Sequence, residues 1–376
     1  MKLTKLSLIA IIAVNAAVAG GDIVEIETPS EACNSNTTIN GKLQGYYITN
    51  DATDDMFGDQ SQLGFAATLD VSHKFNNWLT ANFSAIGYVN AFKQPNMIYM
   101  EGNKNGAFFN VANLTATFGD TTFVAGRQLL DTPMLGSFDW LLATSGFEAY
   151  TLVNTSISNV TFVASYVRTL RAQNSGDNFV NLTDIGDGNN WTVGVAYDDK
   201  AISGSVWYYN VDAANYTQVY TDAGYNFGSF KVSGQFASTD YNTGLDSTAF
   251  AGKVETTFSN ITLMAAVSSI SDRAAGFVER DSFYTSSWNT FASTIAIAND
   301  DTMSWKVGAS TTYAGIDAEL SYAGYSDEGS EFDLILGYNI TNCTSVSAVY
   351  SMTDYDINTD TTDSLNALEL VVTYKF

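Results

Sequence analysis

The feature that most constrains this chain is a repeat of short segments in which apolar and polar residues alternate. Between residues 37 and 376, eighteen segments of roughly ten residues follow a period of two, and no long segment has a helical period. In the last segment Leu368 and Leu370 share one side of the chain, while Glu369 and Thr373 share the other. A period of two is typical of β-strands with two unlike faces. The sequence therefore predicts an all-β fold.

The connections between these segments alternate between short and long. Two-residue links such as Gly119-Asp120 and Gly228-Ser229 alternate with long connections such as 168–190 and 272–302. Tight turns at one end and long loops at the other are typical of antiparallel strands that form a transmembrane barrel in an outer membrane. An even number of strands leaves both termini on the periplasmic side. We therefore expect a barrel of about eighteen strands, with sixteen as the alternative.

Edge strands and aromatic residues also favour a barrel over a soluble β-sandwich. A closed barrel satisfies every backbone hydrogen bond in lipid and leaves no open edge, whereas a sandwich of so many strands would have edges to protect. Aromatic residues flank the short turns, as at Phe75 and Trp78, at Phe227 and Phe230, and at the terminal Phe376. We interpret them as an interfacial girdle at the periplasmic rim.

The first residues have the pattern of an export signal. Lys2 and Lys5 precede the apolar stretch 6–14, and Ala17-Val18-Ala19 has the small residues of a cleavage site. We predict a signal peptide at 1–19, a periplasmic segment at 20–36 and a transmembrane barrel at 37–376. No other segment approaches 18 consecutive apolar residues, so no helical span is expected. The expected location is the Gram-negative outer membrane.

The charge balance excludes some partners. The chain has 16 Lys+Arg and 40 Asp+Glu, a formal net charge of −24. Binding to nucleic acid requires clustered positive charge, so nucleic acid is not an expected partner. Two groups of four aspartates in the outer loops do not match an EF-hand spacing, and no His or Cys cluster indicates zinc. We expect no metal and no cofactor.

One long connection differs from the others in composition. Residues 129–146 read LLDTPMLGSFDWLLATSG, whereas the other long connections are polar. Exposing so many apolar side chains to water is unfavourable, so we expect this third external loop to fold into the barrel and narrow it. It carries Asp131 and Asp139, with Glu148 just beyond it. The alternatives are packing against neighbouring external loops or contact with another protomer.

This region resembles a known family. Ala125-Gly126-Arg127-Gln128, Asp131-Thr132-Pro133 and Phe147-Glu148-Ala149 resemble the third-loop region of OprD-like porins and of the related major outer-membrane porins of epsilonproteobacteria. The resemblance implies a homotrimeric diffusion porin in outer-membrane lipid. It also implies that the barrel-assembly machinery recognises the terminal Phe376. It also implies a channel constriction, near which it places Arg127, Asp131, Asp139 and Glu148.

The strand period assigns charged side chains to the inner, water-facing side. These lumen-facing residues are Lys42, Lys253, Glu255, Glu319, Asp333 and Glu369. Because acidic residues outnumber basic ones, the channel mouth is expected to have a negative potential that concentrates cations and is weakened by salt. We therefore predict a water-filled channel for passive diffusion of ions and small hydrophilic solutes, with a cation preference.

Two further predictions concern the cysteines and the alternative functions. Cys33 lies just before the first strand and Cys343 in a periplasmic turn, so we expect a disulfide between them. An enzyme is not expected, because His73 is the single histidine and no Gly-x-Ser-x-Gly motif accompanies it. A surface adhesin or structural barrel with a closed lumen remains the alternative function.

Overall fold

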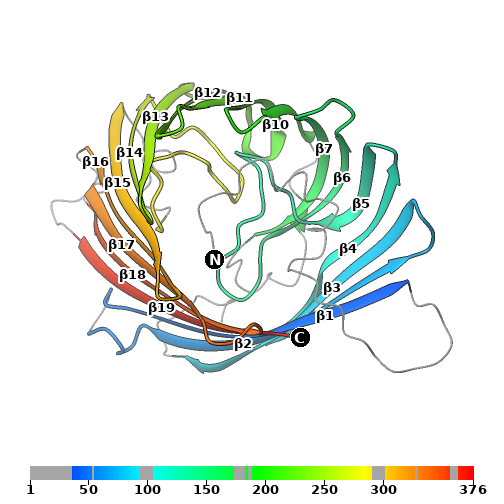
Figure 1. Ribbon diagram of the computed structural model, residues 1–376, viewed down its shortest axis with the longest axis horizontal. Coiled ribbons are helices and arrows are strands. Elements are labelled where there is room, and N and C mark those ends of the chain that lie inside the picture. Colours follow the sequence, from blue (N-terminus) through cyan, green and yellow to red (C-terminus); the bar gives the residue numbers. More distant parts are fainter. Residues whose placement is uncertain are drawn as a thin grey trace.

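A computed structural model describes residues 36–52, 55–93, 105–172, 183–184, 189–289, 301–326, 329–355 and 363–376. Within these residues, eighteen long antiparallel strands form one closed barrel, as the alternating pattern predicts. Figure 1 views the barrel along its axis, with the strands as a ring and two inner loops crossing its lumen. The predicted signal peptide, nearly all of 20–36, and Cys33 lie outside the described residues.

The strands follow the chain order around the barrel. The first half consists of β1 (Thr37–Asn50), β2 (Ser61–Lys74), β3 (Leu79–Lys93), β4 (Gly106–Phe118), β5 (Thr121–Gln128), β6 (Gly146–Asn154), β7 (Val160–Arg171), the two-residue β8 (Thr183–Asp184) and β9 (Asn190–Asp198). The second half consists of β10 (Ile202–Val211), β11 (Tyr216–Asn226), β12 (Phe230–Tyr241), β13 (Ser247–Phe258), β14 (Ile261–Ser271), β15 (Thr302–Tyr313), β16 (Ile316–Tyr325), β17 (Gly329–Asn339), β18 (Thr344–Tyr355) and β19 (Asp363–Lys375). A short 3₁₀ turn, η2 (Asp212–Ala214), links β10 to β11.

The first and last strands close the barrel. β1 pairs antiparallel with β19 from Lys42 opposite Lys375 to Asn50 opposite Ala367. At the end of this pair Gly41 and Phe376 exchange two backbone hydrogen bonds of 2.9 and 3.0 Å. The Phe376 ring lies against Gly41 so closely that a Cβ there would overlap it. Glycine at position 41 therefore leaves the space in which the Phe376 ring covers the seam.

One tight turn at the periplasmic end has the two-residue backbone that hairpins prefer. Between β15 and β16, Ala314 and Gly315 both have positive φ, of 51° and 81°. Two successive residues with positive φ are the mark of the type I′ turn, whose twist matches that of the strands it joins. This turn fixes the register of β15 against β16, and with it the side of the barrel that each of their residues faces.

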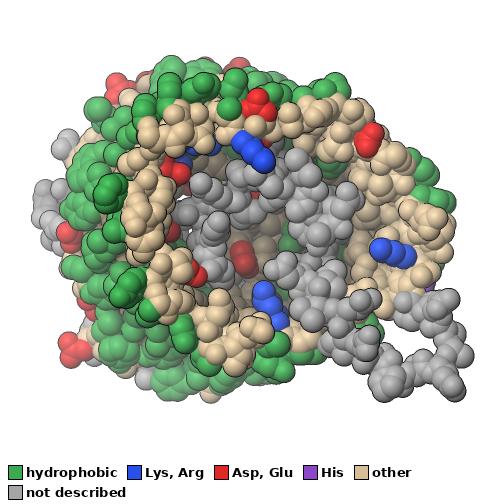
Figure 2. Space-filling model, in the orientation of Figure 1, with side chains coloured by type: hydrophobic (Ala, Val, Ile, Leu, Met, Phe, Trp, Pro, Cys, Tyr) green, Lys and Arg blue, Asp and Glu red, His purple; other side chains and the backbone are tan. Residues whose placement is uncertain are grey.

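The two faces of the strands differ as predicted. Figure 2 shows hydrophobic side chains around the outside of the barrel, with charged side chains mainly at the rim and toward the lumen. Outward residues such as Phe250 (56% exposed) and Val372 (49%) would be unfavourable in water, but they match lipid. The girdle aromatics also face outward, and Trp78 stacks on Phe118 with ring centroids 5.0 Å apart. No helix among the described residues is long and apolar enough to cross a membrane.

Candidate channel constriction

The loop between β5 and β6, here called L3 (residues 129–145), folds into the barrel as its apolar composition predicts. Met134, Leu135 and Leu142 are almost completely buried. Leu130, Met134 and Leu135 pack in one cluster with wall residues that include Trp207 and Tyr209, while Leu141 and Leu142 pack in a second cluster near Tyr46. Burying these side chains against the inner wall removes them from water, which stabilises the inward position.

Hydrogen bonds fasten L3 at several points along the wall. The backbone N–H of Met134 donates to the Tyr209 hydroxyl at 3.2 Å. Near the other end of the loop, the Thr144 carbonyl accepts from Asn110 Nδ2 at 3.1 Å and also from the Arg171 guanidinium. Arg171 is itself 3% exposed and lies over the Phe108 ring. L3 therefore has a defined path and is held to both β4 and β7.

A second loop also folds inward, which the sequence analysis did not predict. It connects β14 to β15 and is here called L7 (residues 272–301, of which 272–289 and 301 are described). Gln218 on β11 donates to the Ala275 and Gly276 carbonyls at 2.6 and 2.9 Å. Further along, Gln235 on β12 donates to the Ser282 carbonyl at 2.6 Å. L7 thus runs across the inner wall and satisfies polar side chains that would otherwise face the lumen.

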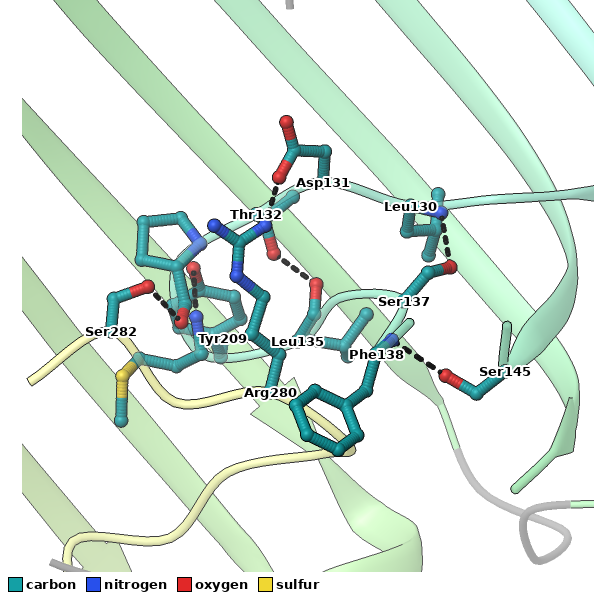
Figure 3. A network of polar contacts seen from close by, with 12 residues as sticks. Leu130, Asp131, Thr132, Leu135, Ser137, Phe138, Ser145, Tyr209, Arg280 and Ser282 are labelled. Carbon is teal, nitrogen blue, oxygen red and sulfur yellow. Dashed lines mark hydrogen bonds and ion pairs between the residues drawn. The ribbon is translucent and has the colours of Figure 1, made fainter. Parts of the chain in front are cut away.

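L3 and L7 bind each other inside the barrel (Figure 3). Arg280 of L7 forms an ion pair with Asp131 of L3. The Ser282 hydroxyl donates to the Pro133 carbonyl at 2.8 Å, and the backbone N–H of Val278 donates to the Met134 carbonyl at 2.9 Å. The two loops therefore form one connected assembly across the lumen.

Glu369 joins this assembly to the closing strand β19. Its carboxylate accepts hydrogen bonds from Trp140 Nε1 of L3 at 3.2 Å and from Trp288 Nε1 of L7 at 3.0 Å. The Tyr46 hydroxyl of β1 is a third donor. Glu369 is only 4% exposed, so its charge is removed from water and depends on these donors. One carboxylate thus links both loops to the barrel seam.

Two more carboxylates on β17 hold the last described part of L7. Glu331 and Asp333 are 0% and 2% exposed. Glu331 accepts from the backbone N–H of Asn289 at 2.7 Å, and Asp333 accepts from the backbone N–H of Trp288 at 3.1 Å. In the described residues no group of three or more His, Cys, Asp or Glu side chains is arranged to hold a metal ion. These acids therefore position L7.

The four residues expected near the constriction separate into two pairs. Asp131 and Asp139 lie on L3 inside the barrel; Asp139 is exposed and accepts from the Thr144 hydroxyl at 2.6 Å. Arg127 and Glu148 instead lie opposite each other on β5 and β6, on the outward face. The structure thus corrects their expected place. In β5 Arg127 has the same parity as Phe123, which faces outward, so it cannot point into the lumen.

All six residues predicted to face the lumen lie on the inner side of their strands: Lys42, Lys253, Glu255, Glu319, Asp333 and Glu369. They differ in contact with water. Lys253 and Glu255 are partly exposed and lie 3.8 Å apart. Asp333 and Glu369 are covered by L7 and L3. The alternation of residues along a strand predicts which way a side chain points, but it does not predict whether a folded loop covers that side chain. Cys343 is exposed in the turn between β17 and β18.

The residues that sequence reasoning missed are mostly those that hold L7. Gln218, Gln235, Arg280 and Trp288 are in this class, whereas Arg171 holds L3. The signal was present in L7 itself, because 272–289 includes Phe277, Phe283, Tyr284 and Trp288. These aromatic residues are the one indication in the sequence that L7 could fold inward.

One acid of L7 has a perturbed titration. Burial raises the pKa of the Asp281 carboxyl above its usual value. Hydrogen bonds from the Ser286 hydroxyl at 2.6 Å and the Phe283 N–H at 3.0 Å act in the opposite direction, as do the charges of Arg280 and Lys306. Docking of L7 therefore shifts the protonation equilibrium of Asp281 toward the neutral form.

Closed strands, an apolar outer face and two inward loops together define the fold of an outer-membrane β-barrel. Solved porin structures from Pseudomonas aeruginosa share this fold. The structure of OpdK with vanillate has a TM-score of 0.74 and 14% identity, covering 91% of this chain and 98% of that one. OpdO gives 0.73 and 16%, covering 91% and 97%. OccD3 (OpdP) gives 0.70 and 15%, covering 90% and 91%.

The likeness to these OprD/Occ barrels extends over nearly the whole of each chain, and at such identities it is a likeness of fold. It agrees with the resemblance found in the third-loop region of the sequence. No protein-family model matches the sequence, and no curated protein matches it.

Proposed function

We propose that this protein is an outer-membrane porin, through which ions and small hydrophilic solutes diffuse passively. The observation that carries the proposal is the assembly of L3 and L7 inside a closed barrel. A barrel of this strand number encloses a water-filled lumen unless something fills it. Here Asp131, Arg280 and Glu369 hold two loops in defined positions across that lumen. Loops fixed in this way narrow a channel and restrict what passes.

We further propose that the channel prefers cations. The chain has a formal net charge of −24. Three basic side chains beside the loops already have acceptors: Arg280 pairs with Asp131, Lys306 donates to the Ser286 carbonyl at 2.7 Å, and Lys253 lies 3.8 Å from Glu255. Asp139, by contrast, is exposed on L3. The resulting negative potential favours cations and falls with ionic strength.

The same charges argue against a shared substrate with OpdK, whose structure contains vanillate, an aromatic carboxylate. A channel that binds carboxylates is expected to have unpaired basic side chains along the path of the solute. Of the described basic residues near L3, Arg171 is buried beneath the loop and Arg280 is paired with Asp131. We propose that aromatic carboxylates are not the preferred solutes of this channel.

Single-channel recording in planar bilayers tests the proposal. In a salt gradient we expect a reversal potential of the sign for cation preference, and Asp139→Asn should reduce it. Asp240→Asn is the matched control, because it removes the same charge from the outer end of β12, on the outward face. A reversal potential of the opposite sign would reject the proposed cation preference. The absence of conductance in correctly folded protein would reject the channel and favour the adhesin.

We also propose a homotrimer in outer-membrane lipid. Support comes from a groove of about 730 Å³ on the outer wall, over β1 to β3 and β19. Its floor includes Gly45, Ala67 and Gly87, whose small side chains leave space for side chains of a second copy. Native mass spectrometry should give a trimer, and Gly87→Trp should weaken it. A monomer under all conditions would contradict this assembly.

A further inference from the structure

The outward face of the barrel has a small charged site that a channel does not require. Arg127, Glu148 and Arg168 lie side by side on β5, β6 and β7. Arg127 is directly opposite Glu148 in the sheet, and Arg168 Nη1 lies 3.6 Å from Glu148 Oε1. The Arg168 side chain is 53% exposed. Two guanidinium groups thus flank one carboxylate, and the site has a net charge of +1.

This arrangement is unusual within the chain. Among the strand side chains that the structure describes, the other Lys and Arg residues alternate with outward apolar residues and so lie on the inner side; they are Lys42, Lys74, Arg171, Lys231, Lys253, Lys306 and Lys375. On the strands that the structure describes, a protein with a formal net charge of −24 therefore places an excess positive charge toward its surroundings at one position. An anionic partner at that position would account for it.

The height of the site matches the external boundary of the membrane. Arg127 is the last residue but one of β5, at its external end. Two residues lower on the same face, Tyr150 pairs with Tyr166, and Tyr166 pairs with Trp191. Tyr150 and Tyr166 are 43% and 41% exposed. Outward tyrosine and tryptophan rings mark the interface between hydrocarbon and headgroups, so the arginines lie at headgroup level.

Local backbone geometry directs Arg168 to this position. The register of β6 and β7 shifts between Glu148 and Ala149, so that Thr169 is opposite Glu148 and Val167 is opposite Ala149. Arg168 is therefore the extra residue of a β-bulge. Bulges redirect a side chain at barrel rims, and here the bulge brings a second guanidinium beside Glu148. Backbones two strands apart are about 10 Å apart, within reach of two arginine side chains converging on one group.

We propose that Arg127 and Arg168 bind a phosphate group of an anionic glycolipid in the outer leaflet of the membrane. Guanidinium forks bind phosphate oxygens through paired, charge-assisted hydrogen bonds. Arg127 uses one donor on the Phe109 carbonyl at 3.1 Å, and a guanidinium has five donors. Glu148 orients Arg168 beside the site. The acyl chains of the lipid then lie along the outward tyrosines and tryptophan below it.

Native mass spectrometry of the folded protein in detergent tests this site, with lipid A carrying both phosphates as the probe. Arg127→Gln/Arg168→Gln is expected to weaken its binding about tenfold or more, because charge-assisted hydrogen bonds are lost. Lys42→Gln/Lys375→Gln removes the same charge from the inner side and should change binding less than twofold. Glu148→Gln should strengthen binding, since it removes a negative charge beside the phosphate. Lipid A without phosphates should bind all variants alike.

Several results would overturn the proposal. Equal losses in the outward and inner double variants would show a nonspecific effect of charge, and equal wild-type binding of the phosphate-free lipid would show that phosphate is not recognised. Displacement of lipid A by an equal concentration of inorganic phosphate would indicate a site for free anions. An outward double variant with weakened oligomers but normal lipid binding would assign the site to contact between copies. If that variant fails to show heat-modifiable gel migration, Arg168→Lys, which keeps the charge but not the fork, replaces it.

Discussion

Replacing Glu369 by alanine should release both inner loops from the wall. The carboxylate accepts from Trp140 Nε1 and Trp288 Nε1 at 3.2 and 3.0 Å, and from the Tyr46 hydroxyl. A hydrogen bond to a charged group contributes about 1.5–3 kcal/mol. Each loop therefore loses about that amount of docking energy, which raises its undocked population about 10- to 150-fold.

The stability of the whole barrel should change less than the docking of the loops. The substitution also removes the cost of burying a carboxylate that is 4% exposed, and this gain offsets part of the loss. The suitable measurements are therefore open-channel current noise and tryptophan emission. We expect greater noise, and emission at longer wavelength as the indoles of Trp140 and Trp288 contact water.

Glu255→Ala is the matched control for this experiment. Glu255 is also an inner-face carboxylate, but its ion-pair partner Lys253 belongs to the same strand. It should leave both the noise and the emission close to those of the wild type. If Glu369→Ala gives wild-type noise and emission, Glu369 does not hold the loops and the reasoning is refuted.

Three other predictions follow from the loops and the cysteines. Arg280→Ala and Asp131→Ala should each increase current noise, and the double variant should add little because both remove the same ion pair; additive effects would contradict this. Because burial raises the pKa of Asp281, the docked L7 is most stable below the usual pKa of an aspartate and loosens as the pH rises through the raised pKa. The open-channel current noise should therefore rise between acid and neutral pH, and Asp281→Asn should remove this rise. If the variant keeps the rise, Asp281 is not its cause. Peptide mapping without reductant should recover Cys33 joined to Cys343, and two free thiols would reject the disulfide.

Strand parity was sufficient to predict which way most side chains face. It placed Glu369 inward and Phe250 outward, and the structure agrees because a one-residue slip would turn every apolar side chain of a strand away from lipid. The inward position of L3 was also predictable from its composition. The alternation of side chains along a strand cannot predict which of them a loop covers. It therefore did not distinguish the buried Asp333 from the partly exposed Glu255.

Two predictions from the sequence were wrong, and each has a physical reason. Arg127 and Glu148 were assigned to the constriction by resemblance, although the alternation with Phe123 in β5 already indicated the outward face. The composition of L7 does not predict its inward position, because its aromatic residues are spread among Asp, Ser, Arg and Glu, whereas L3 is mostly apolar. Its position depends on partners such as Gln218 and Gln235, which are distant in the sequence and meet only in the closed barrel.

The seam between β1 and β19 has a consequence for how the protein matures. Its outermost backbone hydrogen bonds join Gly41 of β1 to Phe376, the residue after β19. A polypeptide that lacks β19 cannot complete the cylinder, since it would carry two open edges capable of pairing with other chains. The polypeptide must therefore be kept apart from its neighbours until β19 has been delivered to the site of assembly.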